Sequence, residues 1–151
     1  MSNDLRIVVD TNVLISGLIG IKNSPSAKIL LAIRKQTIIL VSSPNILEEV
    51  REVINRKRIV KLKKMTKKER GDFIKELIER SDITAGKQLP QIVGRDVEDD
   101  KFIACAIEGK AKYIITGDQD LLILNESKGI KILSPKEFVV LSSTPFFKTT
   151  F

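Results

Sequence analysis

The sequence predicts an α/β fold in which a central parallel β-sheet lies between two helical layers, a three-layer α/β/α sandwich. Short runs rich in isoleucine and valine are typical of buried parallel strands, and such runs recur along the chain. Segments with helical periodicity lie between them, and strands that alternate with helices form a parallel sheet with right-handed crossovers. The length of 151 residues and the hydrophobic content of 42% suit one domain with a substantial core.

The expected strands are short and apolar, and they span residues 5–10, 38–42, 83–85, 112–116 and 130–133. The expected helices span residues 12–19, 25–35, 44–58, 66–80, 97–109, 119–125 and 135–142. Ser43 and Pro44 suit the cap and first turn of their helix, and Thr66 with Glu69 matches a capping box. Residues 86–95 hold two glycines and a proline and are expected to form a loop.

We expect these elements to form one domain over residues 1–142, followed by a C-terminal tail over residues 143–151. The tail holds Phe146, Phe147 and Phe151. Apolar side chains of this kind are expected to pack back on the body of the protein, and the alternative is that they bind a partner.

Composition excludes several classes of chemistry. The chain has no histidine, which excludes histidine acid–base catalysis, Ser-His-Asp and Cys-His nucleophilic schemes, and histidine-bound zinc. A metal held by oxygen ligands alone is expected to be Mg²⁺ or Mn²⁺. The glycine-rich phosphate loops of common nucleotide-binding proteins are also absent from the sequence.

Cysteine usage and hydropathy predict a cytoplasmic protein. Cys105 is the only cysteine and has apolar neighbours, so we expect a core residue and no intrachain disulfide. No segment approaches the roughly 18 apolar residues of a membrane span, and the N-terminus lacks the apolar core of a signal peptide. We therefore expect no membrane partner.

Positive charge is concentrated in residues 51–70, the basic segment. This segment holds ten lysines and arginines and two glutamates, a net charge of +8. The whole chain carries +7, so the remainder carries −1. Such a block favours a polyanionic partner such as a nucleic acid, and the alternative is a solvated connection between helices.

Carboxylates follow two of the expected strands. Asp10 closes the first strand, and Asp118 and Asp120 follow the strand over residues 112–116. The sites of open α/β sheets gather at the carboxyl ends of such strands. Because acids gathered there repel one another unless a cation lies between them, the pattern indicates a metal site.

Helical geometry selects which acid of the helix over residues 44–58 faces inward. The apolar face of that helix is set by Ile46, Leu47, Val50, Val53 and Ile54. At about 100° per residue, Glu49 lies roughly 100° from the centre of this face, whereas Glu48 and Glu52 lie roughly 160° away. Glu49 is therefore expected at the core boundary and the other two in solvent.

The same geometry selects Asp99 on the helix over residues 97–109. Its apolar face is set by Phe102, Ile103, Ala106 and Ile107. Asp99 lies within roughly 10° of the centre of this face, and Asp100 and Glu98 lie roughly 90° and 110° away. A carboxylate on a buried face is costly unless it is paired or metal-bound, although a place in the first helical turn lowers the cost.

Each acidic segment also has a purely structural interpretation. Asp10 can cap the following helix, residues 96–100 can form a capping and solvated turn, and Asp118 can lie in a plain turn. Glu49 by itself is most often a surface residue. The four segments together favour a site, because the fold class brings strand ends and inner helix faces together.

Four segments resemble the PIN domain family in order and spacing, across nearly the whole chain. They span residues 9–17, 43–50, 95–106 and 114–122, and the likeness is greatest to small prokaryotic VapC-like toxins of toxin–antitoxin pairs. The resemblance implies an α/β/α sandwich and a Mg²⁺- or Mn²⁺-dependent ribonuclease site. The catalytic residues and metal ligands that it implies are Asp10, Glu49, Asp99 and Asp118.

Supporting residues and partners are also expected. By the resemblance, Thr116 matches the threonine or serine that precedes the last acid of the family, and Asp120 can substitute for or assist Asp118. Further supporting residues are Asn12, Asp96 and Asp100. We expect RNA to contact the basic segment through Arg56, Lys57, Arg58, Lys61, Lys63, Lys64, Lys67 and Lys68. The other expected partners are an antitoxin protein and a second copy of the chain in a homodimer.

Three functions are compatible with these observations. The leading hypothesis is a metal-dependent endoribonuclease that acts as the toxin of a type II toxin–antitoxin pair. The second is a non-catalytic RNA- or protein-binding module of the same fold, against which the intact set of acids argues. The third is a receiver-type phosphoacceptor, which would need two acids in the first acidic loop and a lysine after the last strand. Asp10 stands alone in that loop, although Lys136 lies near the required place.

Overall fold

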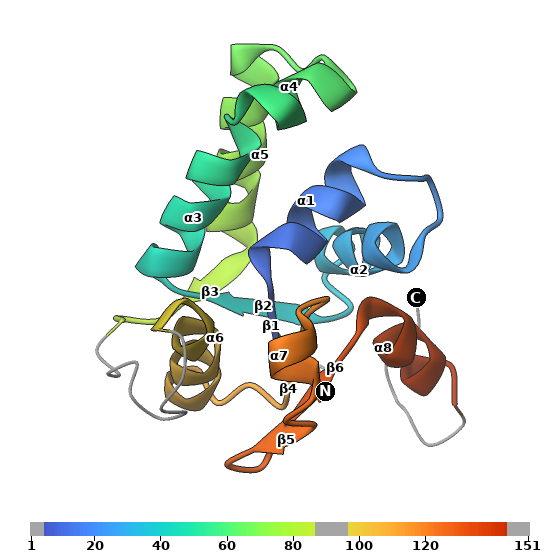
Figure 1. Cartoon of the computed structure of the whole chain (residues 1–151), viewed down its shortest axis with the longest axis vertical. Helices are drawn as coiled ribbons and strands as arrows, with labels where there is room; N and C mark the ends of the chain where they lie inside the picture. Colours follow the sequence, from blue (N-terminus) through green and yellow to red (C-terminus); the bar gives the residue numbers. More distant parts are fainter. Residues whose placement is uncertain (1–4, 87–96, 145–151) are drawn as a thin grey trace.

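The computed structural model describes residues 5–86 and 97–144, with side chains from residue 101 onward in the second range. In this part of the chain one six-stranded sheet has the order β3-β2-β1-β4-β6-β5 (Figure 1). Its strands are β1 (Arg6–Val9), β2 (Ile39–Ser42), β3 (Ser81–Ile83), β4 (Tyr113–Ile115), β5 (Glu126–Ser127) and β6 (Ile130–Leu133). All neighbouring strands pair in parallel except β5 and β6, which are antiparallel.

The centre of the sheet is buried on both faces, as the apolar runs of the sequence predict. Ile7, Val8 and Val9 of β1 are at most 1% exposed, and Ile114 and Ile115 of β4 are fully buried. Val9 lies beside Ile115 in the register of the two strands. The two central strands therefore end side by side.

Helices cover both faces of the sheet and complete the predicted three-layer sandwich. Figure 1 shows α1, α2, α3 and α5 on one side of the sheet and α6 on the other, while α8 packs against α2 and β6. The helices of the described residues are α1 (Thr11–Ile19), α2 (Pro25–Arg34), α3 (Pro44–Ile54), α4 (Lys57–Lys63), α5 (Lys67–Arg80), α6 (Val97–Glu108), α7 (Gln119–Leu122) and α8 (Pro135–Ser142).

A close crossing fixes α1 against α2 beside the strand ends. A Cβ atom on Gly17 would lie only 2.6 Å from the carbonyl oxygen of Ser26. Real Cβ atoms do not approach backbone atoms so closely, so only glycine lets the two helices approach this far. The crossing sets the position of Ser26 relative to the start of α1.

The expected helix over residues 44–58 is wrong, because the chain forms two helices there. α3 ends at Ile54, where the side-chain Nδ2 of Asn55 donates to the carbonyl of Arg51 and the Oδ1 of Asn55 accepts a hydrogen bond from Arg70. These bonds hold the chain in a bend before α4 begins. α4 in turn ends at Lys64, which has a left-handed backbone conformation with φ of 54°.

Smaller corrections concern strands and helix ends. β3 begins at Ser81, two residues before the expected strand, and α7 ends at Leu122, before the expected end at residue 125. β5 was not expected, and it makes the sheet edge antiparallel through a turn at Lys128 and Gly129, both with positive φ. The sheet is thus parallel in its interior and antiparallel at one edge.

Two expectations lie outside the described residues: most of the loop over residues 86–95 and the packing of the phenylalanine-rich tail. No helix in the described ranges is long and apolar enough to cross a membrane.

Candidate active site

A cleft opens at the carboxyl ends of β1 and β4. These strands are neighbours in the sheet, but the connection from β1 leads toward β2 and that from β4 leads toward β6 on the opposite side. Such a reversal is where open α/β sheets form their binding sites. The cleft has a volume of about 490 Å³. It is lined by Asp10, Asn12, Val13, Ser16, Ser26, Glu49, Phe102, Gly117, Asp118 and Pro135.

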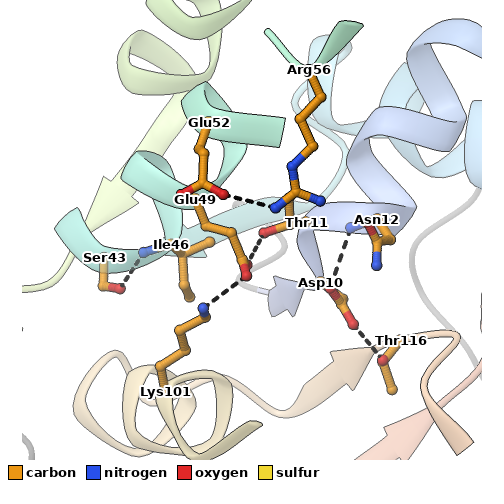
Figure 2. Close-up of polar contacts among 10 residues, drawn as sticks. All are labelled: Asp10, Thr11, Asn12, Ser43, Ile46, Glu49, Glu52, Arg56, Lys101 and Thr116. Carbon is orange, nitrogen blue, oxygen red and sulfur yellow. Dashed lines mark hydrogen bonds and ion pairs between the residues drawn. The ribbon is translucent and has the colours of Figure 1, made fainter. Parts of the chain in front are cut away.

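Asp10 lines this cleft and is 7% exposed. Figure 2 shows its side chain bonded to Asn12 and Thr116. Its Oδ1 accepts a hydrogen bond from the backbone N–H of Asn12 at 3.2 Å, and its Oδ2 accepts one from the Thr116 hydroxyl at 2.7 Å. Asp10 therefore caps α1, as the structural interpretation predicted, and also lies in the cleft.

The electrostatic environment of Asp10 opposes its negative charge. Burial raises its pKa above the ordinary value of 3.8, and the carboxylates of Glu49 and Asp118 raise it further. The hydrogen bonds from Thr116 and Asn12 act in the opposite direction without cancelling the increase. A cation in the cleft would stabilise the ionised form.

Thr116 connects Asp10, which follows β1, to Asp118, which follows β4. Its hydroxyl donates to Asp10 and accepts from the backbone N–H of Asp118 at 3.0 Å. Asp118 is partly buried, caps α7 and lines the cleft. Asp120 is exposed and does not line the cleft. The structure therefore brings Asp118, and not its alternative Asp120, together with Asp10.

Glu49 approaches the same cleft from α3. Its Oε1 accepts a hydrogen bond from the Thr11 hydroxyl, and its Oε2 forms an ion pair with the Lys101 ammonium at 2.9 Å (Figure 2). The side chain of Glu49 is 27% exposed, whereas those of Glu48 and Glu52 are 68% and 69% exposed. The helical geometry of the sequence thus placed the three glutamates correctly.

The fourth expected acid, Asp99, belongs to the first turn of α6, but its side chain lies outside the described residues, as does that of Asp100. Asp96 also lies outside the described ranges. Among the side chains described, no three acids come close enough to hold a metal ion by themselves.

The donor chemistry of the cleft nevertheless fits Mg²⁺ or Mn²⁺. Asp10, Glu49 and Asp118 all line it and offer only oxygen ligands, which these hard cations prefer. Burial, and to a smaller extent the neighbouring Glu49 and Asp118 carboxylates, raise the pKa of Asp10, and a cation bound beside it would offset both effects. An ion held there would need a further oxygen, which the α6 acids or water can supply.

Four residues of the site were not selected from the sequence. Thr11 and Lys101 hold Glu49, and Ser16 and Ser26 line the cleft. Ser16 lies one turn after Asn12 on α1, a spacing that could have indicated it. Lys101 follows the acidic residues of α6 directly, but its pairing with Glu49 joins positions 52 residues apart and has no local signal.

The remaining candidates lie elsewhere. Figure 1 shows α4 at the end of α3 and α5 that points away from the sheet, and the predicted RNA-binding residues on and around it are exposed. Lys136 is exposed and does not line the cleft. Cys105 is 2% exposed and burial raises its pKa to about 12, which is consistent with a core residue.

Fold and site together define an α/β/α protein with an acidic cleft at a topological switch point. The chain belongs to the PIN domain family, whose model matches residues 6–120. It is 35% identical over 161 aligned residues to the protein MJ1680 of Methanocaldococcus jannaschii, covering 89% of this chain and 90% of that protein.

Two solved structures share the fold. VapBC2 from Rickettsia felis, bound to a DNA fragment from its promoter, has a chain that matches with a TM-score of 0.55 and 13% identity, over 84% of this chain and 96% of that chain. PAE2754 from Pyrobaculum aerophilum matches with a TM-score of 0.58 and 14% identity, over 93% of this chain and 91% of that chain. At these identities the likeness extends to the fold.

Proposed function

We propose that this PIN domain protein is a metal-dependent endoribonuclease and the toxin of a type II toxin–antitoxin pair. The observation that carries the proposal is the position of Asp10, a buried carboxylate in a cleft shared with Glu49 and Asp118. Burial and the two neighbouring acids raise its pKa. An arrangement that is costly for the protein alone becomes favourable when a divalent cation binds.

Each described side chain has a definite task in this proposal. Asp10, Glu49 and Asp118 would hold the ion, together with Asp99 of α6. Thr116 orients Asp10 and favours its ionised form by donating to Oδ2. When bound, Mg²⁺ or Mn²⁺ supplies an activated water nucleophile and stabilises the charge that develops on the phosphate. No histidine is required for this chemistry.

Binding of RNA must come mainly from outside the acidic cleft. No lysine or arginine is among the described residues that line it, so the cleft by itself repels a phosphate backbone. The basic segment carries +8, and its lysines on and around α4 are exposed. We therefore assign the attraction of RNA to this segment.

The VapBC2 structure has the same fold, and its name supports an antitoxin as a protein partner of this chain. We also propose a homodimer as the assembly. Co-expression with the product of a small neighbouring gene, followed by co-purification and size-exclusion chromatography with light scattering, tests both. A chain that purifies alone and as a monomer would contradict this part of the proposal.

The direct test of the catalytic proposal is cleavage of a structured RNA by the purified chain. We expect no cleavage after chelation and full recovery when Mg²⁺ or Mn²⁺ is added. Binding of RNA without cleavage in either metal would favour the non-catalytic module. Labelling of Asp10 by acetyl phosphate would favour the phosphoacceptor.

A further inference from the structure

Lys101 is unusually enclosed for a lysine. Its side chain is 13% exposed, and its ammonium lies 5.5 Å from the centre of the Phe102 ring. Lysines are rarely buried to this extent without a counter-charge. The carboxylate of Glu49 supplies one at 2.9 Å, and this ion pair joins α6 to α3.

Glu49 is held at both of its oxygens before any ion binds. Thr11 donates to Oε1 and Lys101 to Oε2. The pair differs from the solvated ion pairs elsewhere on α3, since the side chains of Glu52 and Arg56 are 69% and 55% exposed. Screening by water and salt is weaker for the enclosed pair, so the Coulomb attraction between Lys101 and Glu49 is larger than that of an exposed pair.

Lys101 reaches Glu49 from outside the cleft. Glu49 lines the cleft, whereas Lys101 lines a separate small cavity of about 30 Å³ together with Ser43, Ala104 and Cys105. A divalent ion in the cleft and the ammonium of Lys101 would therefore approach one carboxylate from two sides.

We propose that Lys101 is a tethered counter-ion of the metal site, which neutralises Glu49 from outside the cleft and thereby lowers the affinity of the cleft for a divalent cation. The inference rests on the proposed function, because it requires Glu49 to be a metal ligand. In the metal-free protein the ammonium limits repulsion among the acids. In the metal-bound protein the same charge repels the ion.

Two effects of removing the ammonium oppose each other, and their sizes decide the sign. Loss of one contact frees the Glu49 side chain, but Thr11 still holds Oε1, so the cost in ordering is small. Loss of a positive charge close to a doubly charged ion is a larger effect in a partly enclosed site. Removing the charge of Lys101 should therefore strengthen metal binding.

Thermal unfolding of the full chain in increasing Mn²⁺ tests this without any RNA. We compare the wild type with Lys101→Met, which keeps the apolar stem against Phe102, and with Lys101→Arg, which keeps the charge. Lys112→Met is the matched control. Lys112 is exposed and directly precedes β4, at the amino end of a strand whose carboxyl end forms the cleft. Lys101→Gln replaces the methionine variant if that variant does not fold.

We expect Lys101→Met to unfold at a lower temperature without metal and to need about tenfold less Mn²⁺ for half-maximal stabilisation. The Mn²⁺ requirement of Lys101→Arg and Lys112→Met should stay within about twofold of that of the wild type. Lys101→Arg keeps the positive charge, and the charge that Lys112→Met removes lies far from the cleft. Equal or weaker Mn²⁺ binding by Lys101→Met, in a wild type that does respond to Mn²⁺, would overturn this inference alone. A wild type that is not stabilised by Mn²⁺ would overturn the proposed function as well.

Discussion

Glu49 and Glu52 lie one turn apart on α3, and they belong to two regions that use charge in different ways. Glu49 faces the acidic cleft, is 27% exposed and is held by Thr11 and Lys101. Glu52 belongs to the basic segment and pairs with Arg56, with both side chains more than half exposed. One helix thus carries a fixed charge at one place and a solvated charge one turn later.

The function of the cleft depends on exact geometry, whereas that of the basic segment depends on total charge. In the cleft Asp10, Glu49 and Asp118 have defined partners and are at least partly buried, so a single change should act strongly. In the basic segment many similar charges lie in solvent, where single ion pairs contribute about 1 kcal/mol or less. Single substitutions in the basic segment should therefore change stability and RNA binding only weakly, and only combined substitutions should have a large effect.

The largest expected effect is that of Asp10→Asn, which should reduce metal-dependent RNA cleavage by more than about 100-fold, since even outer-shell partners of a metal are worth about 10- to 100-fold. Cleavage of one RNA in Mn²⁺ by the wild type and the variant measures this. Asp72→Asn, an exposed aspartate on α5, is the control. Normal cleavage by Asp10→Asn would show that the cleft is not the active site.

The same variant has a predicted effect on stability with a definite pH dependence. Because the pKa of Asp10 in the folded protein is raised above 3.8, the folded state loses stability as pH rises through that raised pKa. Without metal, Asp10→Asn should therefore be more stable than the wild type at pH 7, by a few degrees in Tm on a scale of about 3 °C per kcal/mol. The difference should shrink as the pH approaches 4.

The next prediction compares neighbouring acids whose side chains are expected to point in different directions, one toward the cleft and one toward solvent. Glu49→Gln should lower Mn²⁺ affinity about 10- to 100-fold, while Glu48→Gln, whose side chain is in solvent, should change it little. Asp99→Asn against Asp100→Asn extends the comparison to α6. Calorimetric titration measures the Mn²⁺ affinity of all four variants. A larger loss of affinity in Glu48→Gln than in Glu49→Gln, or in Asp100→Asn than in Asp99→Asn, would contradict the assignment of ligands from helical geometry.

A combined change is needed in the basic segment. Reversal of Lys61, Lys63, Lys64, Lys67 and Lys68 to glutamate should weaken RNA binding at least about tenfold and reduce its salt dependence by roughly 0.7 units of slope per lost contact. Cleavage at saturating RNA should change less, because the carboxylates are untouched. An unchanged salt slope would indicate that this surface faces solvent or a protein partner.

The smallest effect is expected from Thr116→Val. Loss of the hydroxyl removes a hydrogen bond that lowers the pKa of Asp10, so the acid limb of the cleavage profile should move to higher pH. Stability should fall by about 1 kcal/mol. Thr37→Val, which removes a hydroxyl bond to Ala32 away from the cleft, should cost similar stability and leave the pH profile unchanged.

Local sequence patterns were sufficient to predict the central strands of the sheet and to predict that the Glu49 side chain lies at the boundary of the core. Apolar runs predicted β1, β2, β4 and β6, because burial on both faces leaves a strong signal over a few residues. Glu49 followed from the strong amphipathic pattern of α3. The end of α3 at Ile54 was missed because it depends on Asn55 and Arg70, a contact across 15 residues, and because α4 has no side-chain N-cap.

The pairing of charges in the site could not be predicted for a related reason. The Lys101–Glu49 pair, the Thr11–Glu49 bond and the Thr116–Asp10 bond join residues between 38 and 106 positions apart. Sequence periodicity reports which face of an element is buried, but it contains no information on which side chains meet across elements. Such contacts require the fold itself.

The proposed activity requires that the carboxylates at the ends of β1 and β4 bind a divalent cation. Crystals of the wild type grown with Mn²⁺ and measured for anomalous scattering test it most directly. We predict an anomalous peak in the cleft, with a carboxylate oxygen of Asp10 at about 2.0–2.2 Å and ligands from Glu49 or Asp118 as well. A cleft without a peak at saturating Mn²⁺, or a peak that makes no contact with Asp10, would contradict the account.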